Sequence, residues 1–288
     1  MSKKNKIILI AILGLLFLAS FCAVTYPLVS NQQAEKQKDA IVLRYQEAVS
    51  NAETIDDAIA AARTYNSALA NGQTALADYG VQLDPNGIGM MGFVTIPAIG
   101  VELPIYHGTQ SLELGAVHLQ GTSLPVGGEG THCVISAHSG MTTQKMFTDL
   151  EQLAVGDVFY LHILDETLAY QVDSIKTVLP YDTSLLGIVS GKDYCTLVSC
   201  TPYGINTHRL LVRGTRIPYE EAEIIVEETA QEEQPRSSWE EKYLLGLFLG
   251  VLAVLIIFLA AVILMRIHKR YIARQKSARR KVNNYAAK

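Results

Sequence analysis

Two long apolar runs constrain this chain more than any other feature of its sequence. Residues 7–29 and 243–265 each contain 23 residues without Asp, Glu, Lys or Arg. A helix of about 20 residues, rising about 1.5 Å per residue, matches the roughly 30 Å hydrocarbon core of a bilayer. A buried core helix is the alternative interpretation, and it is uncommon at this length. We therefore expect two membrane-spanning helices and a lipid bilayer as one partner of the chain.

The first run also has features of a secretory signal peptide, because Lys3, Lys4 and Lys6 precede it. No Ala-x-Ala cleavage site follows the run. Lipid attachment at Cys22 would require a small residue before it, and Phe21 is bulky. An uncleaved anchor is the preferred interpretation, and cleavage would leave the second run as the anchor.

The charge distribution indicates the orientation of the two runs. The 24 basic residues include three in residues 1–6 and nine in residues 266–288, so that 12 remain between the runs, together with all 28 acidic residues. Basic segments next to membrane helices stay on the cytoplasmic side. Both termini are therefore expected in the cytoplasm and the acidic middle outside. A basic cluster directly after an apolar run indicates topology and contact with lipid headgroups rather than nucleic-acid binding.

The segment after the first run has a helical pattern. Ile41, Tyr45 and Val49 recur at nearly helical spacing. The pair Asp56-Asp57 and the later Asn71-Gly72 are suitable start and stop signals for a second helix. Residues 30–78 are therefore expected to form one or two helices that lift the next domain off the membrane.

From Gly92 onward the hydrophobic period changes to two. Residues 93–96, 158–164 and 168–172 alternate between apolar and polar side chains, and glycines and prolines separate such runs. Many short strands with turns between them predict one all-β barrel or sandwich of about 125 residues. After Tyr219 the chain becomes acidic with few large apolar side chains, which indicates a solvated linker.

The cysteines indicate a free thiol in the outward segment. Cys22 lies in the first run, whereas Cys133, Cys195 and Cys200 lie between the runs, and three cysteines cannot all pair with one another. Cys200 ends the apolar run 194–199 and is followed by Thr-Pro-Tyr-Gly, which stops strand pairing. A thiol at a strand end beside a loop is accessible on a rigid support. An inert buried thiol is the alternative for any single cysteine.

A nucleophilic cysteine needs a proton carrier and a donor for the developing oxyanion. Arg209 lies at the start of the apolar run 210–214, so a hairpin can bring it back towards Cys200, although a surface ion pair is its alternative role. His138 resembles Cys200 in its placement, because it ends the run 133–137 and precedes Ser-Gly. The other outward histidines lie in contexts that need no catalytic role: His107, His118, His132, His162 and His208.

Three motifs in order resemble those of the sortase family. Residues 196–200, Thr-Leu-Val-Ser-Cys, are similar to its Thr-Leu-x-Thr-Cys signature, with Ser199 in place of the second Thr. Residues 137–140, Ala-His-Ser-Gly, resemble the histidine segment, and residues 208–214, His-Arg-Leu-Leu-Val-Arg-Gly, resemble the arginine strand. Residues 200–209, the helical extension and the second apolar run are similar to class C, the pilin-polymerising sortases.

The resemblance implies a mainly β fold, an eight-stranded sortase-type barrel with an N-terminal helical extension and two transmembrane helices. It also implies that Cys200, His138 and Arg209 meet at one end of a groove. Cys200 would attack the Thr carbonyl of a Leu-Pro-x-Thr-Gly-like sorting signal, His138 would protonate the departing Gly amine, and Arg209 would stabilise the oxyanion. A Lys amine of a pilin subunit would then take the acyl group. No cofactor or metal is expected.

The same resemblance implies partners and a location. The partners are pilins or surface proteins with a Leu-Pro-x-Thr-Gly signal, a Lys-bearing pilin subunit and the lipid bilayer, with no nucleic acid. The location is the plasma membrane of a Gram-positive bacterium, with the catalytic domain outside. Three alternatives stay open: a housekeeping-type sortase that attaches proteins to cell-wall peptide, a hydrolytic cysteine protease and an exterior partner-binding domain.

Class C sortases commonly carry a lid with an Asp-Pro-aromatic motif just before the barrel. Asp84 and Pro85 match this motif, and Asn86 stands where the aromatic residue belongs.

The resemblance also makes the strands that end in His138 and Cys200 parallel neighbours. Cys133 and Cys195 each lie five residues before one of these residues, so they should be adjacent on the opposite face. They are expected either as two reduced core thiols, the favoured alternative, or as a disulfide.

The expected domain organisation assigns every residue to one segment. The segments are a cytoplasmic N-terminus (1–6), a transmembrane helix (7–29), an extracellular helical extension (30–78), a candidate lid (79–91), a catalytic β-barrel (92–219), an acidic linker (220–242), a second transmembrane helix (243–265) and a basic cytoplasmic tail (266–288).

Overall fold

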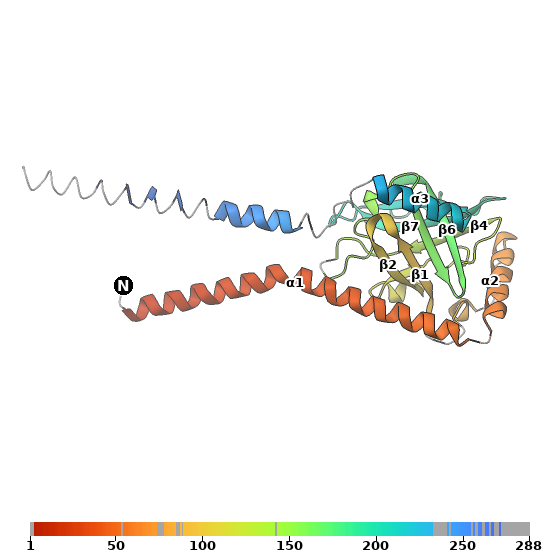
Figure 1. The fold of residues 1–288 in the computed structure, drawn as a ribbon, viewed down its shortest axis with the longest axis horizontal. Helices are drawn as coiled ribbons and strands as arrows, with labels where there is room; N and C mark the ends of the chain where they lie inside the picture. Colours follow the sequence, from red (N-terminus) through yellow and green to blue (C-terminus); the bar gives the residue numbers. More distant parts are fainter. Residues whose placement is uncertain are drawn as a thin grey trace, which may run out of the picture. The chain divides into compact units, whose positions relative to one another are not determined.

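The chain divides into two compact units, Met1–Arg236 and Ser237–Lys288. The computed structural model describes residues 3–52, 54–73, 78–84, 87, 89–141, 143–232, 241, 243–254, 256, 259–260, 263–264, 266–267 and 271. In the second unit, residues 243–254 are helical. All the strands of the described residues lie in the first unit (Figure 1).

Eight strands of the described residues close into a barrel in the order β1-β2-β3-β4-β7-β8-β6-β5. Their bounds are β1 Met90–Ile96, β2 Val101–His107, β3 Ala116–His118, β4 Thr131–Ser136, β5 Val158–Ile163, β6 Glu166–Val178, β7 Asp193–Thr201 and β8 His208–Ile217. Two neighbouring pairs, β2–β3 and β4–β7, are parallel, and the others are antiparallel. The expected eight-stranded barrel is confirmed.

The alternation of side chains along each strand produces the core. On β7, Cys195 and Leu197 point into the main core cluster, whereas Val198 belongs to a separate outer cluster. Inside the barrel, Phe159 and Tyr170 stack with ring centroids 5.5 Å apart. Successive strand residues face opposite sides of a sheet, so a closed barrel buries every second side chain. On the outer face of β4, β7 and β8, a smaller cluster of Val134, Val198 and Leu211 is covered by Leu119, Val178 and Leu186.

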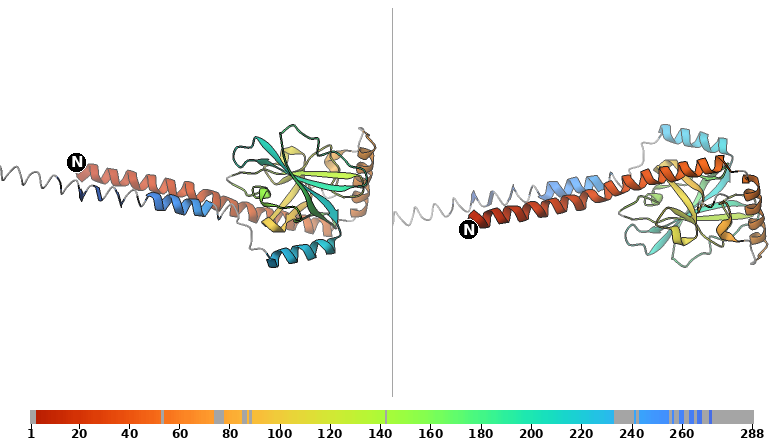
Figure 2. Two further views of the ribbon diagram at one scale, coloured as in Figure 1. Left: turned by 90° about the horizontal axis from the view of Figure 1, so that it is seen from above. Right: turned by 90° about the horizontal axis from the view of Figure 1, so that it is seen from below.

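Two helices precede the barrel, as the sequence predicts. α1 extends over Lys3–Ser50 and includes Pro27, and α2 extends over Ile55–Ala70. The last part of α1 packs on the barrel through Val42, Tyr45 and Val49, and the Tyr45 hydroxyl donates to the carbonyl of Met91 at 2.8 Å. Figure 2 shows the last part of α1 beside the barrel in both views, with the rest of the helix extending beyond it. Four short 3-10 helices complete this unit: η1 Tyr79–Val81, η2 Pro97–Ile99, η3 Thr109–Ser111 and η4 Leu150–Gln152.

The start of the predicted linker differs from the expectation. Residues Tyr219–Glu232 form the helix α3. Its Ala222 is fully buried against Val158 and Tyr160 of β5, and Ile225 and Val226 pack on the same cluster. These small and medium apolar residues at spacings of three and four create a narrow apolar face, which anchors an otherwise acidic helix to the barrel.

Within the part of the chain that is described, no helix is both long enough and apolar enough to cross a membrane. The second expected span, residues 243–265, lies partly outside the described residues, and both expected spans stay predictions.

Candidate active site

Cys200 lies at the second-to-last position of β7, next to a turn that returns the chain to β8. Within that turn, the N–H groups of Ile205 and Asn206 both donate to the carbonyl of Pro202 at 3.0 Å. Arg209 on β8 is the direct cross-strand partner of Cys200. The predicted hairpin is confirmed, and it places the side chains of Cys200 and Arg209 on the same face of the sheet, because side chains of paired residues project to the same face.

His138 follows β4 by two residues, and β4 is the parallel neighbour of β7. Ser136 pairs with Val198, and the N–H of Ala137 donates to the carbonyl of Val198 at 3.1 Å, which continues the pairing beyond the end of β4. His138 and Cys200 each lie two residues beyond the Ser136–Val198 pair. The three residues singled out from the sequence therefore come from three adjacent strands, in the order β4, β7 and β8.

Several polar contacts surround these residues. The Ser139 hydroxyl donates to the carbonyl of Cys200. The Arg209 Nη1 donates to the carbonyls of His208 at 3.0 Å and Asn206 at 3.3 Å, which holds the guanidinium at its own turn. A carboxylate oxygen of Glu113 lies 3.5 Å from Nε2 of His138. Sequence reasoning missed Glu113, which lies outside every motif, whereas Ser139 belongs to the histidine segment.

The thiol lies on a partly open surface. Cys200 is half-buried, and the His138 side chain is 31% exposed. A small hollow next to the thiol is lined by residues from the segment after β4, the end of β7, the following turn and the start of β8: Ser139, Thr148, Glu151, Ser199, Cys200, Thr201, Tyr203 and Leu210. A thiol with a neighbouring imidazole and guanidinium can attack an acyl group, move a proton and stabilise an oxyanion.

An apolar surface lies next to these residues on the outer face of the barrel. Its buried base consists of Val134, Val198 and Leu211. Val134 precedes His138 by four residues, Val198 precedes Cys200 by two, and Leu211 follows Arg209 by two. Because these separations are even, each base residue lies on the same face as its partner. Leu119, Val178 and Leu186 pack against this base. The connection from β6 to β7 adds further exposed apolar side chains: Leu179, Tyr181, Leu185 and Val189.

Cys133 and Cys195 lie inside the barrel. They are register partners on the parallel strands β4 and β7, and they are 2% and 0% exposed. The expected adjacency is confirmed, and both thiols are free. Burial raises the pKa of Cys195 well above its usual value. Their inward orientation separates them from the outward-facing Cys200.

Four other histidines of the barrel make structural contacts: His107, His118, His132 and His162. His132 bonds the carbonyl of Gly187 at 2.9 Å and the Thr196 hydroxyl at 2.7 Å. Burial lowers the pKa of His132 and of His107, and lowers that of His162 to about 4. A histidine that stays neutral in a closed environment is poorly suited to proton transfer with a substrate.

The candidate lid is described only in part. Asp84 accepts a hydrogen bond from the N–H of Gly89 at 2.8 Å, while Pro85 and Asn86 lie outside the described residues. The buried Leu83 has a positive φ of 60°. Within the described ranges, the structure contains no group of three or more His, Cys, Asp or Glu side chains that could hold a metal ion.

An eight-stranded barrel with a cysteine, a histidine and an arginine at adjacent strand ends defines a class of thiol-dependent acyl-transfer folds. A model of the sortase domain matches residues 94–217. Sortase A of Streptococcus agalactiae is 28% identical over 125 residues, which are 42% of this chain and 50% of that protein. The chain thus spans about half the length of this curated relative.

Two solved structures are more similar to the chain. Sortase C1 of Streptococcus agalactiae is 43% identical and has a TM-score of 0.59, covering 62% of this chain and 98% of that one. Sortase C of Clostridium perfringens, solved with the C-terminal cell wall sorting motif, is 48% identical with a TM-score of 0.56, covering 62% and 98%. The chain belongs to the sortase family of cysteine transpeptidases. Its strong structural neighbours are class C sortases.

Proposed function

We propose that this protein is a class C sortase that cleaves a Leu-Pro-x-Thr-Gly-like sorting signal and transfers the Thr carbonyl to a Lys amine of a pilin subunit. The proposal rests on one observation, the arrangement of three residues. Cys200 and Arg209 are cross-strand partners on β7 and β8. His138 lies level with Cys200 on the continuation of β4, the parallel neighbour of β7. The similarity to a pilus-related sortase C of Group B Streptococcus supports the class of substrate.

The chemistry follows from the roles of the three side chains. The Cys200 thiolate attacks the Thr carbonyl, and the guanidinium of Arg209 donates to the resulting oxyanion. His138 gives a proton to the departing Gly amine, so that the C–N bond breaks and a thioester forms. A Lys amine then attacks the thioester, the thiol leaves, and an isopeptide bond joins the two proteins.

The surface around the thiol supports an extended apolar substrate. The outer cluster of Val134, Val198 and Leu211 lies on the same face as Cys200, and the connection from β6 to β7 contributes exposed apolar side chains beside it. The Leu and Pro of a sorting signal would bury apolar area against the exposed side chains of this connection, at about 25 cal/mol per Å². The uncharged runs 7–29 and 243–265 support an anchored enzyme with its barrel outside a Gram-positive plasma membrane.

The decisive experiment uses the full chain and a Leu-Pro-x-Thr-Gly peptide, with mass spectrometry of the protein. The wild type should gain the mass of the acyl fragment, and Cys200→Ala should gain none. His138→Ala should remain folded and form adduct at least about a hundredfold more slowly, because proton transfer contributes about 10²–10⁴ in rate. An adduct on Cys200→Ala would remove the thiol from the mechanism.

The acceptor is tested in a second step. A Lys-bearing pilin fragment added to the acyl-enzyme should yield an amide-linked product. A cell-wall peptide used in preference to the pilin fragment would indicate a housekeeping role, and release of the free Thr acid alone would indicate a hydrolase. Absence of any adduct would favour a partner-binding domain.

A further inference from the structure

The segment that follows His138 is fixed to the histidine itself. The N–H of Phe147 donates to the carbonyl of His138 at 3.0 Å, and the N–H of Gly140 donates to the Thr148 hydroxyl at 3.1 Å. Phe147 and Leu150 are fully buried. The position of residues 143–147, here called the histidine loop, therefore determines where the main chain of His138 lies.

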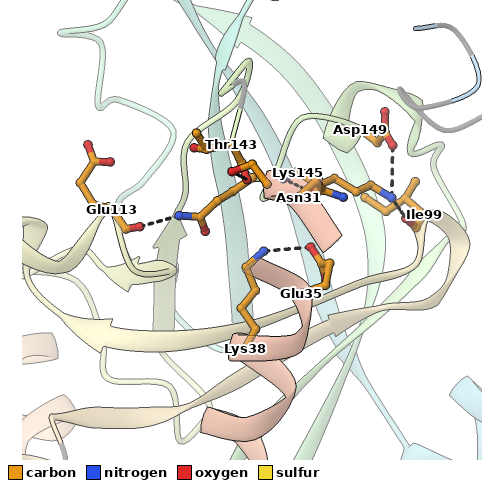
Figure 3. Close-up of polar contacts among 10 residues, drawn as sticks. Asn31, Glu35, Lys38, Ile99, Glu113, Thr143, Lys145 and Asp149 are labelled. Carbon is orange, nitrogen blue, oxygen red and sulfur yellow. Dashed lines mark hydrogen bonds and ion pairs between the residues drawn. The ribbon is translucent and has the colours of Figure 1, made fainter. Parts of the chain in front are cut away.

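The helix α1 holds the histidine loop from outside the barrel. The side-chain oxygen of Asn31 accepts a hydrogen bond from the N–H of Lys145 at 2.8 Å, and the Ser30 hydroxyl donates to the carbonyl of Thr143 at 3.3 Å (Figure 3). Asn31 is only 3% exposed. A buried amide that accepts a main-chain N–H fixes the position of that peptide, because leaving the N–H unpaired is costly.

The side chain of Lys145 ties the same loop to a second element. Its ammonium donates to the carbonyl of Ile99 in η2 at 2.7 Å and lies 3.3 Å from the carboxylate of Asp149 (Figure 3). The Lys145 and Asp149 side chains are 15% and 5% exposed. The next residue, Met146, is buried with a positive φ of 43°. Such a conformation persists in a non-glycine residue only where its surroundings fix it.

A second route leads from the loop to the imidazole. The Gln144 amide donates to the main-chain carbonyl of Glu113 at 3.1 Å, and a carboxylate oxygen of Glu113 lies 3.5 Å from Nε2 of His138. His138 is therefore contacted at two points: Phe147 bonds its main-chain carbonyl, and Glu113 lies next to its ring nitrogen Nε2. Both routes pass through residues 144–147.

We propose that Asn31 is a positioning residue for His138, acting through its hydrogen bond to Lys145 and the histidine loop. The inference rests on the proposed function, because it concerns the proton carrier of that site. Asn31 is the second residue after the apolar run 7–29. The helix that is proposed to anchor the enzyme thus also sets the geometry of its histidine, and no catalytic role in direct contact with the substrate is assigned to Asn31.

Three variants of the full chain test this inference. Asn31→Ala removes the acceptor oxygen, whereas Asn31→Asp keeps one. Glu35→Gln is the matched control, because Glu35 lies one turn further along α1 and pairs with Lys38 at 3.0 Å rather than with the histidine loop (Figure 3). All three are compared by thermal unfolding, by acyl-enzyme formation with the Leu-Pro-x-Thr-Gly peptide, and by the NMR signals of the His138 imidazole.

Asn31→Ala should lower kcat for acyl transfer about ten- to a hundredfold and leave KM within about twofold, since misplacing a catalytic group affects the reaction more than binding. Its His138 signals should shift or broaden, Asn31→Asp should recover most of the rate, and Glu35→Gln should behave like the wild type. Equal rates and unchanged His138 signals in Asn31→Ala would overturn the inference. So would an equal loss in Glu35→Gln, which would indicate a general effect on α1.

The NMR measurement separates this inference from the proposed function. A wild-type chain that forms no acyl-enzyme would contradict the proposed function, while shifted His138 signals in Asn31→Ala alone would still support the positioning contact. An active wild type with unchanged signals and rates in Asn31→Ala would contradict the positioning role only.

Discussion

Cys200 and Arg209 occupy directly opposed positions on the antiparallel strands β7 and β8, at the end of the barrel where the chain turns between them. The guanidinium is held there by two carbonyls of its own turn, those of Asn206 and His208. Because both side chains project from one pair of strands, the proposed oxyanion donor and the proposed nucleophile are positioned by the same two strands.

This geometry predicts that Arg209→Lys fails almost as completely as Arg209→Ala. A lysine ammonium keeps the charge but lacks the planar set of donors, and loss of an oxyanion donor costs about 10²–10³ in rate. The acyl-enzyme rate measures the effect. Arg213→Lys is the matched control on the same strand face, because Arg213 pairs with Asp173 at 2.9 and 3.0 Å. Near-normal turnover of Arg209→Lys would exclude a role that depends on the guanidinium.

The inner cysteines predict a specific thiol count. Cys133 and Cys195 are buried and free, whereas Cys22 is exposed and Cys200 is half-buried. In the proposed membrane-anchored form Cys22 lies inside the first apolar run, so the native full chain should label quickly at Cys200, and the denatured chain should show all four thiols. Mass spectrometry after alkylation without reductant makes the count. Two thiols in the denatured chain would mean that Cys133 and Cys195 are bridged.

The lid hypothesis concerns the turn before β1. The Asp84 carboxylate accepts the N–H of Gly89, so Asp84→Ala should loosen this turn and speed the reaction of Cys200 with a thiol reagent. A Cys22→Ser background leaves Cys200 as the accessible thiol. Asp78→Ala is the control, since Asp78 accepts from Gly80 at 3.0 Å in the same segment. If both variants label at the wild-type rate, the segment is only a connection.

His162 predicts a pH dependence of stability. Its ring stacks on Phe93 with centroids 4.3 Å apart, and burial lowers its pKa from 6.5 to about 4. The unfolded chain therefore binds a proton that the folded chain does not bind between these pH values. The stability contributed by the neutral His162 is complete above about pH 6.5 and is lost as the pH decreases towards 4.

The substitution His162→Gln tests this effect. Glutamine can still reach the hydroxyls of Thr95 and Thr167, which His162 contacts at 3.0 and 3.1 Å, but it does not titrate. Thermal unfolding of the full chain at pH 7.5 and 4.5 should show a smaller loss for the variant. The other buried histidines contribute equally to both proteins, so identical losses would show that His162 is not responsible.

The hairpin of Cys200 and Arg209 was predictable because two apolar runs separated by Pro and Gly describe it locally. The adjacency of Cys133 and Cys195 followed only from the family resemblance, since a parallel pair leaves no local signal. The helix α3 escaped prediction because its acidic composition outweighs the narrow apolar face around Ala222.

The contact between Asn31 and Lys145 could not have been predicted from the residues. It joins a polar side chain to a main-chain N–H 114 positions away, and such a bond has no periodicity or composition of its own. Glu113 was missed for the same reason, because an acidic residue in an exposed turn is ordinary in any sequence. Both become apparent only when the fold brings distant segments together.

The parallel pairing of β4 with β7 has a consequence for the order in which activity is acquired. Parallel strands cannot be joined by a tight turn, and residues 137–192 lie between these two. A newly made chain can close the hairpin of β7 and β8 early, but the histidine reaches its place beside β7 only after β4 has paired with β7 across this long connection. On the proposed mechanism, a molecule in which this pair has not formed, or has opened, would carry the nucleophile without its proton carrier.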